Sequence, residues 1–232
     1  MSSFNEIKSY KDKEMRQYIL AYLLIAVASI GLQAYLENGR AVSIDSLFQM
    51  AMTDILVGAI SILVVVLNEM WSDQAKTRLV YWKLPSNSVF TNIRDGKSNS
   101  DGYDICKAKE IYAHLSDASA NKQTAEWNKL LRKCKEAGHG NVLDAQRMQL
   151  MTRDICMTTI SLLILNVSAV IVLAFIQGNF CRAIMTLGLP IVYLAIMLIV
   201  TRVAANSRAK RLVHLVIKND VQDRDRNEKN DY

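Results

Sequence analysis

The sequence has little that would build an enzyme active site or a disulfide framework. Its 232 residues contain no glycine-rich phosphate loop, no His-Glu-x-x-His motif, and no Ser-His-Asp or Cys-His arrangement with a defensible spacing. The four cysteines include no Cys-x-x-Cys element, which argues against a disulfide-stapled domain and against a zinc site. We therefore expect no enzymatic activity, no cofactor and no bound metal.

Long apolar runs, in contrast, are abundant, and 51% of the residues are hydrophobic. Four runs, residues 18–36, 47–67, 155–176 and 183–201, are each long enough to cross a hydrocarbon core, which takes about 20 helical residues. They form two pairs around a long polar insert. The sequence predicts an all-α integral membrane protein whose four transmembrane helices form two hairpins.

This arrangement divides the chain into five segments. A leader that is basic and either amphipathic or partly disordered precedes the first hairpin. A helical domain lies between the hairpins, and a basic tail follows the second. The expected bounds are 1–17 for the leader, 18–69 and 155–201 for the hairpins, 70–154 for the inserted domain and 202–232 for the tail.

Within the insert and the tail, helical segments are expected at several places. The second span is predicted to continue unbroken as a helix to Lys83, and further helices are expected at 104–115 and 124–136. In the tail, residues 212–217 form an amphipathic stretch able to pack on the insert. The final stretch, 220–232, is nearly all charge and is expected to fray.

The distribution of positive charge predicts the orientation. Only two of the 28 Lys and Arg residues, Arg40 and Arg182, fall in the short turns between paired spans. Lys and Arg concentrate on the cytosolic side of membrane proteins. We expect both termini and the insert in the cytosol of a bacterium, with the chain in its inner membrane. The net charge of +6 fits this bias, or attraction to a nucleic acid or nucleotide.

A polar stripe runs along the second span. Asp54, Gly58, Ser61 and Asn68 recur at helical spacing and share one face. One interpretation is an aqueous path in an oligomer, where a ring of Asp54 carboxylates would favour cations. The other is a packing face, with Asp54 held by a partner such as Asn166 or Thr186. We take the four stripe residues as pore-lining candidates, and we expect Asn166 itself to join helices.

Cations and aromatic rings follow the second span. Arg78, Tyr81, Trp82 and Lys83 resemble the surfaces with which single-strand binders hold phosphates and stack bases. An interfacial aromatic belt is the alternative. Trp82 lies about 16 Å along a helix beyond Trp71, which is far for a belt residue. These four residues are therefore candidates for a ligand site.

The layout resembles a known class of proteins. Four spans, a helical insert, the Tyr81-Trp82-Lys83-Leu84-Pro85 stretch and the Arg153-Asp154 pair before the third span are similar to bacterial four-span effectors of antiphage defence. The Hailong-type membrane effector comes first and the Kiwa membrane protein second. The Hailong resemblance implies a tetrameric channel controlled by an oligonucleotide that a partner nucleotidyltransferase makes.

Together these features predict an oligomeric membrane effector. The insert would sense a nucleotide or oligonucleotide and gate an ion-conducting pore, and opening would depolarise the cell. Two alternatives stay open. One is a non-conducting membrane scaffold that recruits a cytosolic enzyme, and the other is a small proton-coupled exporter with Asp54 as the proton carrier.

Overall fold

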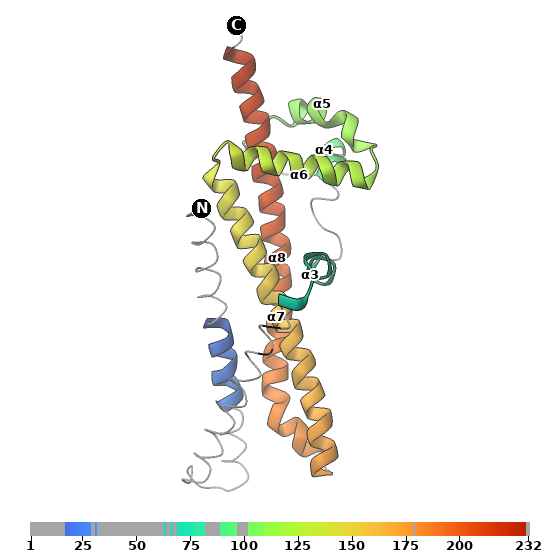
Figure 1. Ribbon diagram of the computed structural model, residues 1–232, viewed down its shortest axis with the longest axis vertical. Helices are drawn as coiled ribbons and strands as arrows, with labels where there is room; N and C mark the ends of the chain where they lie inside the picture. Colours follow the sequence, from blue (N-terminus) through green and yellow to red (C-terminus); the bar gives the residue numbers. More distant parts are fainter. Residues whose placement is uncertain are drawn as a thin grey trace. The chain divides into compact units, whose positions relative to one another are not determined.

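The chain is helical throughout the part that the structure describes. In the computed structural model this part comprises residues 17–28, 31, 63, 66, 69–81, 89–96, 102–178 and 180–230, and these ranges contain no strand. The expected all-α class is confirmed. An apolar helix at Gln17–Ala28 precedes α3 (Asp73–Val80), α4 (Val89–Arg94), α5 (Ile105–Ser116), α6 (Ala120–Glu136), α7 (Gly140–Gln177) and α8 (Phe180–Asn230) (Figure 1).

The two longest helices carry membrane-length apolar segments. Such segments lie in Gly140–Phe175 of α7 and Leu187–Lys229 of α8, and α8 continues through Pro190. Only 17% of the apolar segment of α8 is buried, whereas a core helix of a soluble protein would be mostly buried. Both helices are thus long and apolar enough to span a membrane, as predicted for the third and fourth runs.

The first two predicted spans are described only in part. The Gln17–Ala28 helix covers the first half of the 18–36 run. In the 47–67 run, only Leu63 and Val66 are described. The described residues therefore contain two membrane-length apolar helices, and the four-span arrangement stays a prediction.

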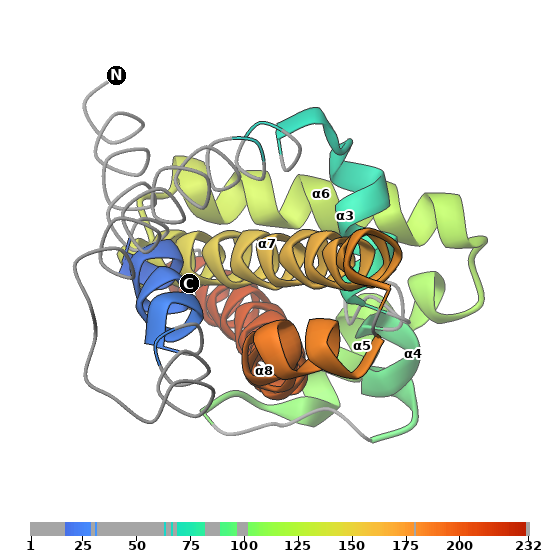
Figure 2. The same cartoon turned by 90° about the horizontal axis from the view of Figure 1, so that it is seen from below.

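The chain divides into two compact units, and α7 and α8 contribute to both. The first unit is Met1–Lys76 with Arg153–Arg202, and the second is Thr77–Thr152 with Val203–Tyr232. In the first unit α7 and α8 run side by side (Figure 1). The Gln17–Ala28 helix lies next to them (Figure 2) and packs through Tyr18 and Tyr22.

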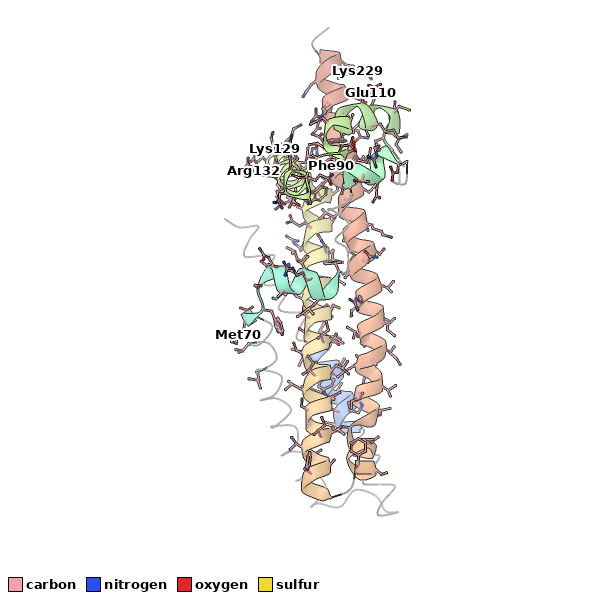
Figure 3. All side chains as sticks on the ribbon, turned by 90° about the vertical axis from the view of Figure 1, so that its right-hand side faces the viewer. Met70, Phe90, Glu110, Lys129, Arg132 and Lys229 are labelled. Carbon is pink, nitrogen blue, oxygen red and sulfur yellow. The ribbon has the colours of Figure 1, made fainter. Side chains whose placement is uncertain are left out.

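The second unit packs α4, α5 and α6 against the last part of α8. In α6 the buried residues Gln123, Trp127, Leu130 and Cys134 are spaced by four, three and four, so they form one face. Phe90 of α4 is only 1% exposed and lies among these helices, whereas Lys129 projects from the outer side of α6 (Figure 3). The core contains Val89, Phe90, Ile93, Ala108, Tyr112, Leu115, Trp127, Leu130, Cys134, Val142, Ala145, Leu212, Val216, Ile217 and Val221.

Local signals account for the ends of these helices. The side chain of Asp104 accepts a 2.8 Å hydrogen bond from the backbone N–H of Cys106 and caps α5. After α6, Gly138 adopts a φ of +78°, the left-handed conformation that ends helices. The two predicted insert helices are therefore present, although α6 begins at Ala120 instead of residue 124.

The prediction of an unbroken helix through residue 83 is wrong. The chain bends at Trp71, and a separate helix, α3, begins after Ser72. The Ser72 hydroxyl accepts a 3.2 Å hydrogen bond from the N–H of Ala75, so it acts as an N-cap. The sequence did not predict this cap because the apolar periodicity of the second span continues across Ser72.

Two other parts of the chain also differ from expectation. The helix α8 continues to Asn230, so the prediction that residues 220–232 fray is wrong for the described residues up to 230. Ion pairs, described below, hold this charged stretch in place. The short helix α4 was not predicted because its six residues are too few for a periodic signal.

Candidate functional site

A buried carboxylate lies on the part of α8 that belongs to the second unit. Leu212, Val216 and Asp220 follow one another at four-residue spacing, so they share one helix face. That face is covered, and Asp220 is only 1% exposed. A carboxylate in such a position is costly unless charged or hydrogen-bonding partners surround it.

Three donors from three helices surround Asp220. The Tyr112 hydroxyl on α5 donates to Oδ2 at 2.6 Å, and Lys133 Nζ on α6 donates to Oδ1 at 2.8 Å. Arg224, one turn further along α8, donates from Nε to Oδ2 at 2.9 Å. We call Asp220, Tyr112, Lys133 and Arg224 the Asp220 clamp. It joins α5 and α6 to a single point on α8.

The electrostatics of the clamp favour an ionised Asp220 beside a neutral Tyr112. Burial opposes ionisation of Asp220, but hydrogen bonds from Lys133 and Tyr112 and the charge of Arg224 outweigh it and lower the pKa of Asp220. Burial and the neighbouring Asp220 charge raise the pKa of Tyr112 well above its ordinary value. At neutral pH the phenol is therefore a proton donor to a carboxylate.

Further contacts join other residues of the second unit to α8. His139 Nε2 lies 2.9 Å from Asp223 Oδ2. Lys107 Nζ lies 2.8 Å from Asp225 Oδ1. A thiol contact from Cys134 reaches the carbonyl oxygen of Val216 at 3.8 Å. The second unit therefore holds α8 from Val216 to Asp225, and the acidic residues of the tail serve as its attachment points.

The cysteines and histidines of the insert do not assemble a metal site. Among the residues that the structure describes, no group of three or more His, Cys, Asp or Glu side chains is placed to hold an ion. Cys134 belongs to the buried core, where burial raises the pKa of its thiol to about 11, while His139 bonds Asp223. Cys134 is thus a protonated core residue at neutral pH.

In the first unit, a charged cluster joins α3 to α7. Lys76 Nζ lies 3.7 Å from Asp154 Oδ1, and the two side chains are 9% and 2% exposed. Arg153 is 3.3 Å from the same oxygen and 2.7 Å from Asp73 Oδ1. Because Asp154 immediately precedes the apolar run 155–176, this cluster ties the first turns of α3 to the start of that run.

Polar side chains also join the Gln17–Ala28 helix to α7. Asn166 Nδ2 donates to the Tyr22 hydroxyl at 2.7 Å and to the Leu162 carbonyl oxygen at 2.8 Å. The Tyr18 hydroxyl lies 2.7 Å from Thr159 Oγ1. Asn166 therefore joins helices, as the sequence predicted. Asp54 lies outside the described residues, so the predicted bond between Asp54 and Asn166 stays a prediction.

Most of the predicted site residues cannot be placed. Asp54, Gly58, Ser61 and Asn68, the pore-lining candidates, lie outside the described residues. The same holds for Trp82 and Lys83 of the predicted ligand surface.

The two remaining ligand candidates differ in exposure. Arg78 is exposed in the last turn of α3. Tyr81 follows this helix and is only 5% exposed, so its ring offers no open face for a base. The sequence reading missed the Asp220 clamp. The available signal was an acid placed in line with Leu212 and Val216 on an apolar face.

Comparison with protein-family models, curated proteins and solved structures finds no match to this chain. The resemblance to antiphage effectors therefore stays an expectation based on layout.

Proposed function

We propose that the chain is an oligomeric membrane pore whose opening is controlled by a ligand at its inserted domain. The observation that supports this proposal most directly is the continuity of α8. This single helix of 51 residues contains a membrane-length apolar segment and, further along, the buried Asp220. A change in how α5 and α6 hold Asp220 would act on the helix that also contains the apolar segment.

The exposed side chains of the apolar segments support a position in lipid. On α8 these include Val192, Ile196 and Ile199, which are 56%, 56% and 66% exposed. On α7, Ile171 and Phe175 are 49% and 84% exposed. Contiguous apolar surface of this kind is unusual on a soluble monomer and suits a bilayer or a second copy of the chain.

The cluster around Asp154 supplies a second link. Lys76 and Arg153 tie α3 to the start of the apolar run of α7, and α3 leads on to Arg78. Because a buried ion pair is costly to break, motion of α3 would be passed to α7 at that point. Control from the inserted domain thus has two routes, one through α8 and one through α3.

The remaining parts of the proposal come from the sequence and the resemblance. Four spans would assemble as a homotetramer in the bacterial inner membrane, with both termini in the cytosol. Asp54, Gly58, Ser61 and Asn68 would line the conducting path, and the Asp54 carboxylates would favour cations. A nucleotide or oligonucleotide from a partner nucleotidyltransferase would open the pore, which depolarises the membrane during phage infection.

An ion-flux assay in liposomes tests this function. Purified protein is reconstituted, and cation flux is followed with nucleoside monophosphates, cyclic nucleotides and short oligonucleotides added on the side of the inserted domain. We expect at least one nucleotide to start cation flux, and Asp54→Asn to lower the preference for cations over anions without loss of assembly. Assembled wild-type protein that conducts with none of these nucleotides would favour the scaffold instead.

A further inference from the structure

The second unit contains a cavity that none of the predicted site residues lines. It has a volume of about 360 Å³ and lies between α4 and α5. Its floor is apolar and formed by Phe90, Ile93 and Tyr112, which are 1%, 1% and 3% exposed. The rings of Phe90 and Tyr112 lie 5.4 Å apart between centroids. These three side chains close the cavity with an apolar floor, but at these exposures they present no open ring face for stacking.

Positive charge borders the opening. Arg94, in the last turn of α4, and Lys109 of α5 both line the cavity and are exposed. Arg94 is held in place by Asp117, with Nη1 2.6 Å from Oδ1, and by Asp95 at 3.1 Å. Each carboxylate is contacted by one nitrogen of the guanidinium, and the planar fork of arginine can exchange such an exposed carboxylate for a phosphate that it binds bidentately.

Lys109 is the second cation of the opening. It makes no ion pair with any residue in the described part of the chain. Its ammonium group lies near the turn that ends α4, where Gly96 has a φ of +66°. A Cβ placed on Gly96 would lie 3.7 Å from Lys109 Nζ, so the ammonium group sits against this turn. Two cations from different helices, together with the Asp117 carboxylate that pairs with Arg94, therefore border the opening of one cavity.

Tyr112 belongs both to the cavity and to the Asp220 clamp. Its ring forms part of the floor, and its hydroxyl donates the 2.6 Å hydrogen bond to Asp220 on α8. A ligand that presses on this ring would move the hydroxyl relative to the carboxylate. The cavity is therefore placed to change the way in which the second unit holds α8.

We propose that this cavity binds a single small organic phosphate, with the phosphate held by Arg94 and Lys109 and the organic group in the cavity. The volume lies near the lower end of the range for small-molecule sites, about 300–1,000 Å³, which suits one nucleotide unit. The choice of a nucleotide among organic phosphates rests on the proposed function. The site itself rests on the cavity and its two cations.

Calorimetric titration of the purified full-length protein tests the site. The probes are AMP, adenosine and inorganic phosphate. We expect AMP to bind at least tenfold more tightly than either adenosine or phosphate, since it alone both contacts the cations and fills the cavity. Arg94→Gln and Lys109→Gln should each weaken AMP binding at least tenfold. Lys122→Gln, an exposed lysine of α6 outside the cavity, should leave it unchanged.

Three outcomes separate this site from the proposed function. If AMP binds no more tightly than its parts, or if both cavity variants bind like the wild type, the cavity proposal is overturned. If only Arg78→Ala weakens binding, the site lies at the end of α3, which also overturns it. If AMP binds as expected but no nucleotide starts ion flux in liposomes, the cavity stands and the pore fails.

Discussion

The hydroxyl of Tyr112 donates a 2.6 Å hydrogen bond to the carboxylate of Asp220, which lies 108 residues further along the chain. The first residue belongs to α5 and the second to α8. This bond connects the inserted domain to the helix that also contains a membrane-length apolar segment. It is the point at which the account of control is most open to experiment.

Removing the Tyr112 hydroxyl should weaken the second unit. Hydrogen bonds to charged groups contribute about 1.5–3 kcal/mol, and Tyr112→Phe leaves Asp220 with one donor fewer. We expect the free energy of unfolding to fall by about that amount. Denaturant unfolding in detergent can be followed by the fluorescence of Trp127, which is buried in the same core. Glu110→Gln, an exposed position on α5, should change stability little, and an equal loss in both variants would contradict the prediction.

The stability that Asp220 contributes should depend on pH. Its pKa is lowered in the folded state, so its contribution is fully present above the unfolded value of about 3.9. That contribution is lost as the pH falls through the lower folded value. At pH 7 we expect Asp220→Asn to be less stable than the wild type by about 1–3 kcal/mol. The difference should shrink between pH 5 and pH 2, and a constant difference over this range would show that the charge is not what stabilises the clamp.

Tyr22 and Asn166 should be energetically coupled. Hydrogen bonds between membrane helices contribute roughly 0.5–2 kcal/mol across model peptides and double-mutant cycles, with about 0.6 kcal/mol as the average of the cycles. A cycle of Tyr22→Phe and Asn166→Leu, measured by unfolding in a membrane mimetic, should give a coupling in this range. A parallel cycle of Asn166→Leu with Leu24→Ala should give none, because Leu24 is 64% exposed. Equal coupling in the two cycles would mean that the Tyr22 bond is not the cause.

The free cysteines provide a test of orientation. Cys181 and Cys106 are both exposed, whereas Cys134 and Cys156 are buried. In intact cells a membrane-impermeant maleimide should label Cys181, which lies in the predicted outer turn. It should label Cys106 only after the membrane is opened, because the insert is predicted to be cytosolic. Since both thiols are exposed, a difference between them reports the membrane and not burial. Labelling of Cys106 in intact cells would reverse the predicted orientation.

Features that depend on local patterns could be predicted from the sequence. The all-α class, the apolar runs in α7 and α8 and the helix-joining Asn166 each follow from residue type and spacing. The packing of residues 212–217 on the inserted domain was also predicted, and Leu212, Val216 and Ile217 lie in its core. In these cases the signal lies within one helix, where hydrophobic periodicity is informative.

Features that depend on distant residues could not be predicted in the same way. The charged end of α8 was expected to fray because its composition resembles a solvated tail. Its acids are instead paired with Lys133, Lys107 and His139, and nothing in the local sequence indicates these partners. The cavity likewise requires Arg94 and Lys109 to approach from different helices. Ser72 could have been found, since a serine near a helix start is a known cap signal.

Single-channel recording of the Tyr112→Phe variant tests the central claim, which is that the Asp220 clamp controls the pore. The clamp is taken to stabilise the closed state, and Tyr112→Phe removes about 1.5–3 kcal/mol of that stabilisation. The ratio of open to closed channels without ligand should therefore rise at least tenfold. The unitary conductance should not change, because Tyr112 belongs to α5 of the inserted domain and not to the predicted pore-lining stripe. The measurement compares wild-type, Tyr112→Phe and Glu110→Gln proteins in one planar bilayer system. An unchanged ligand-free ratio in the Tyr112→Phe channels would contradict the account.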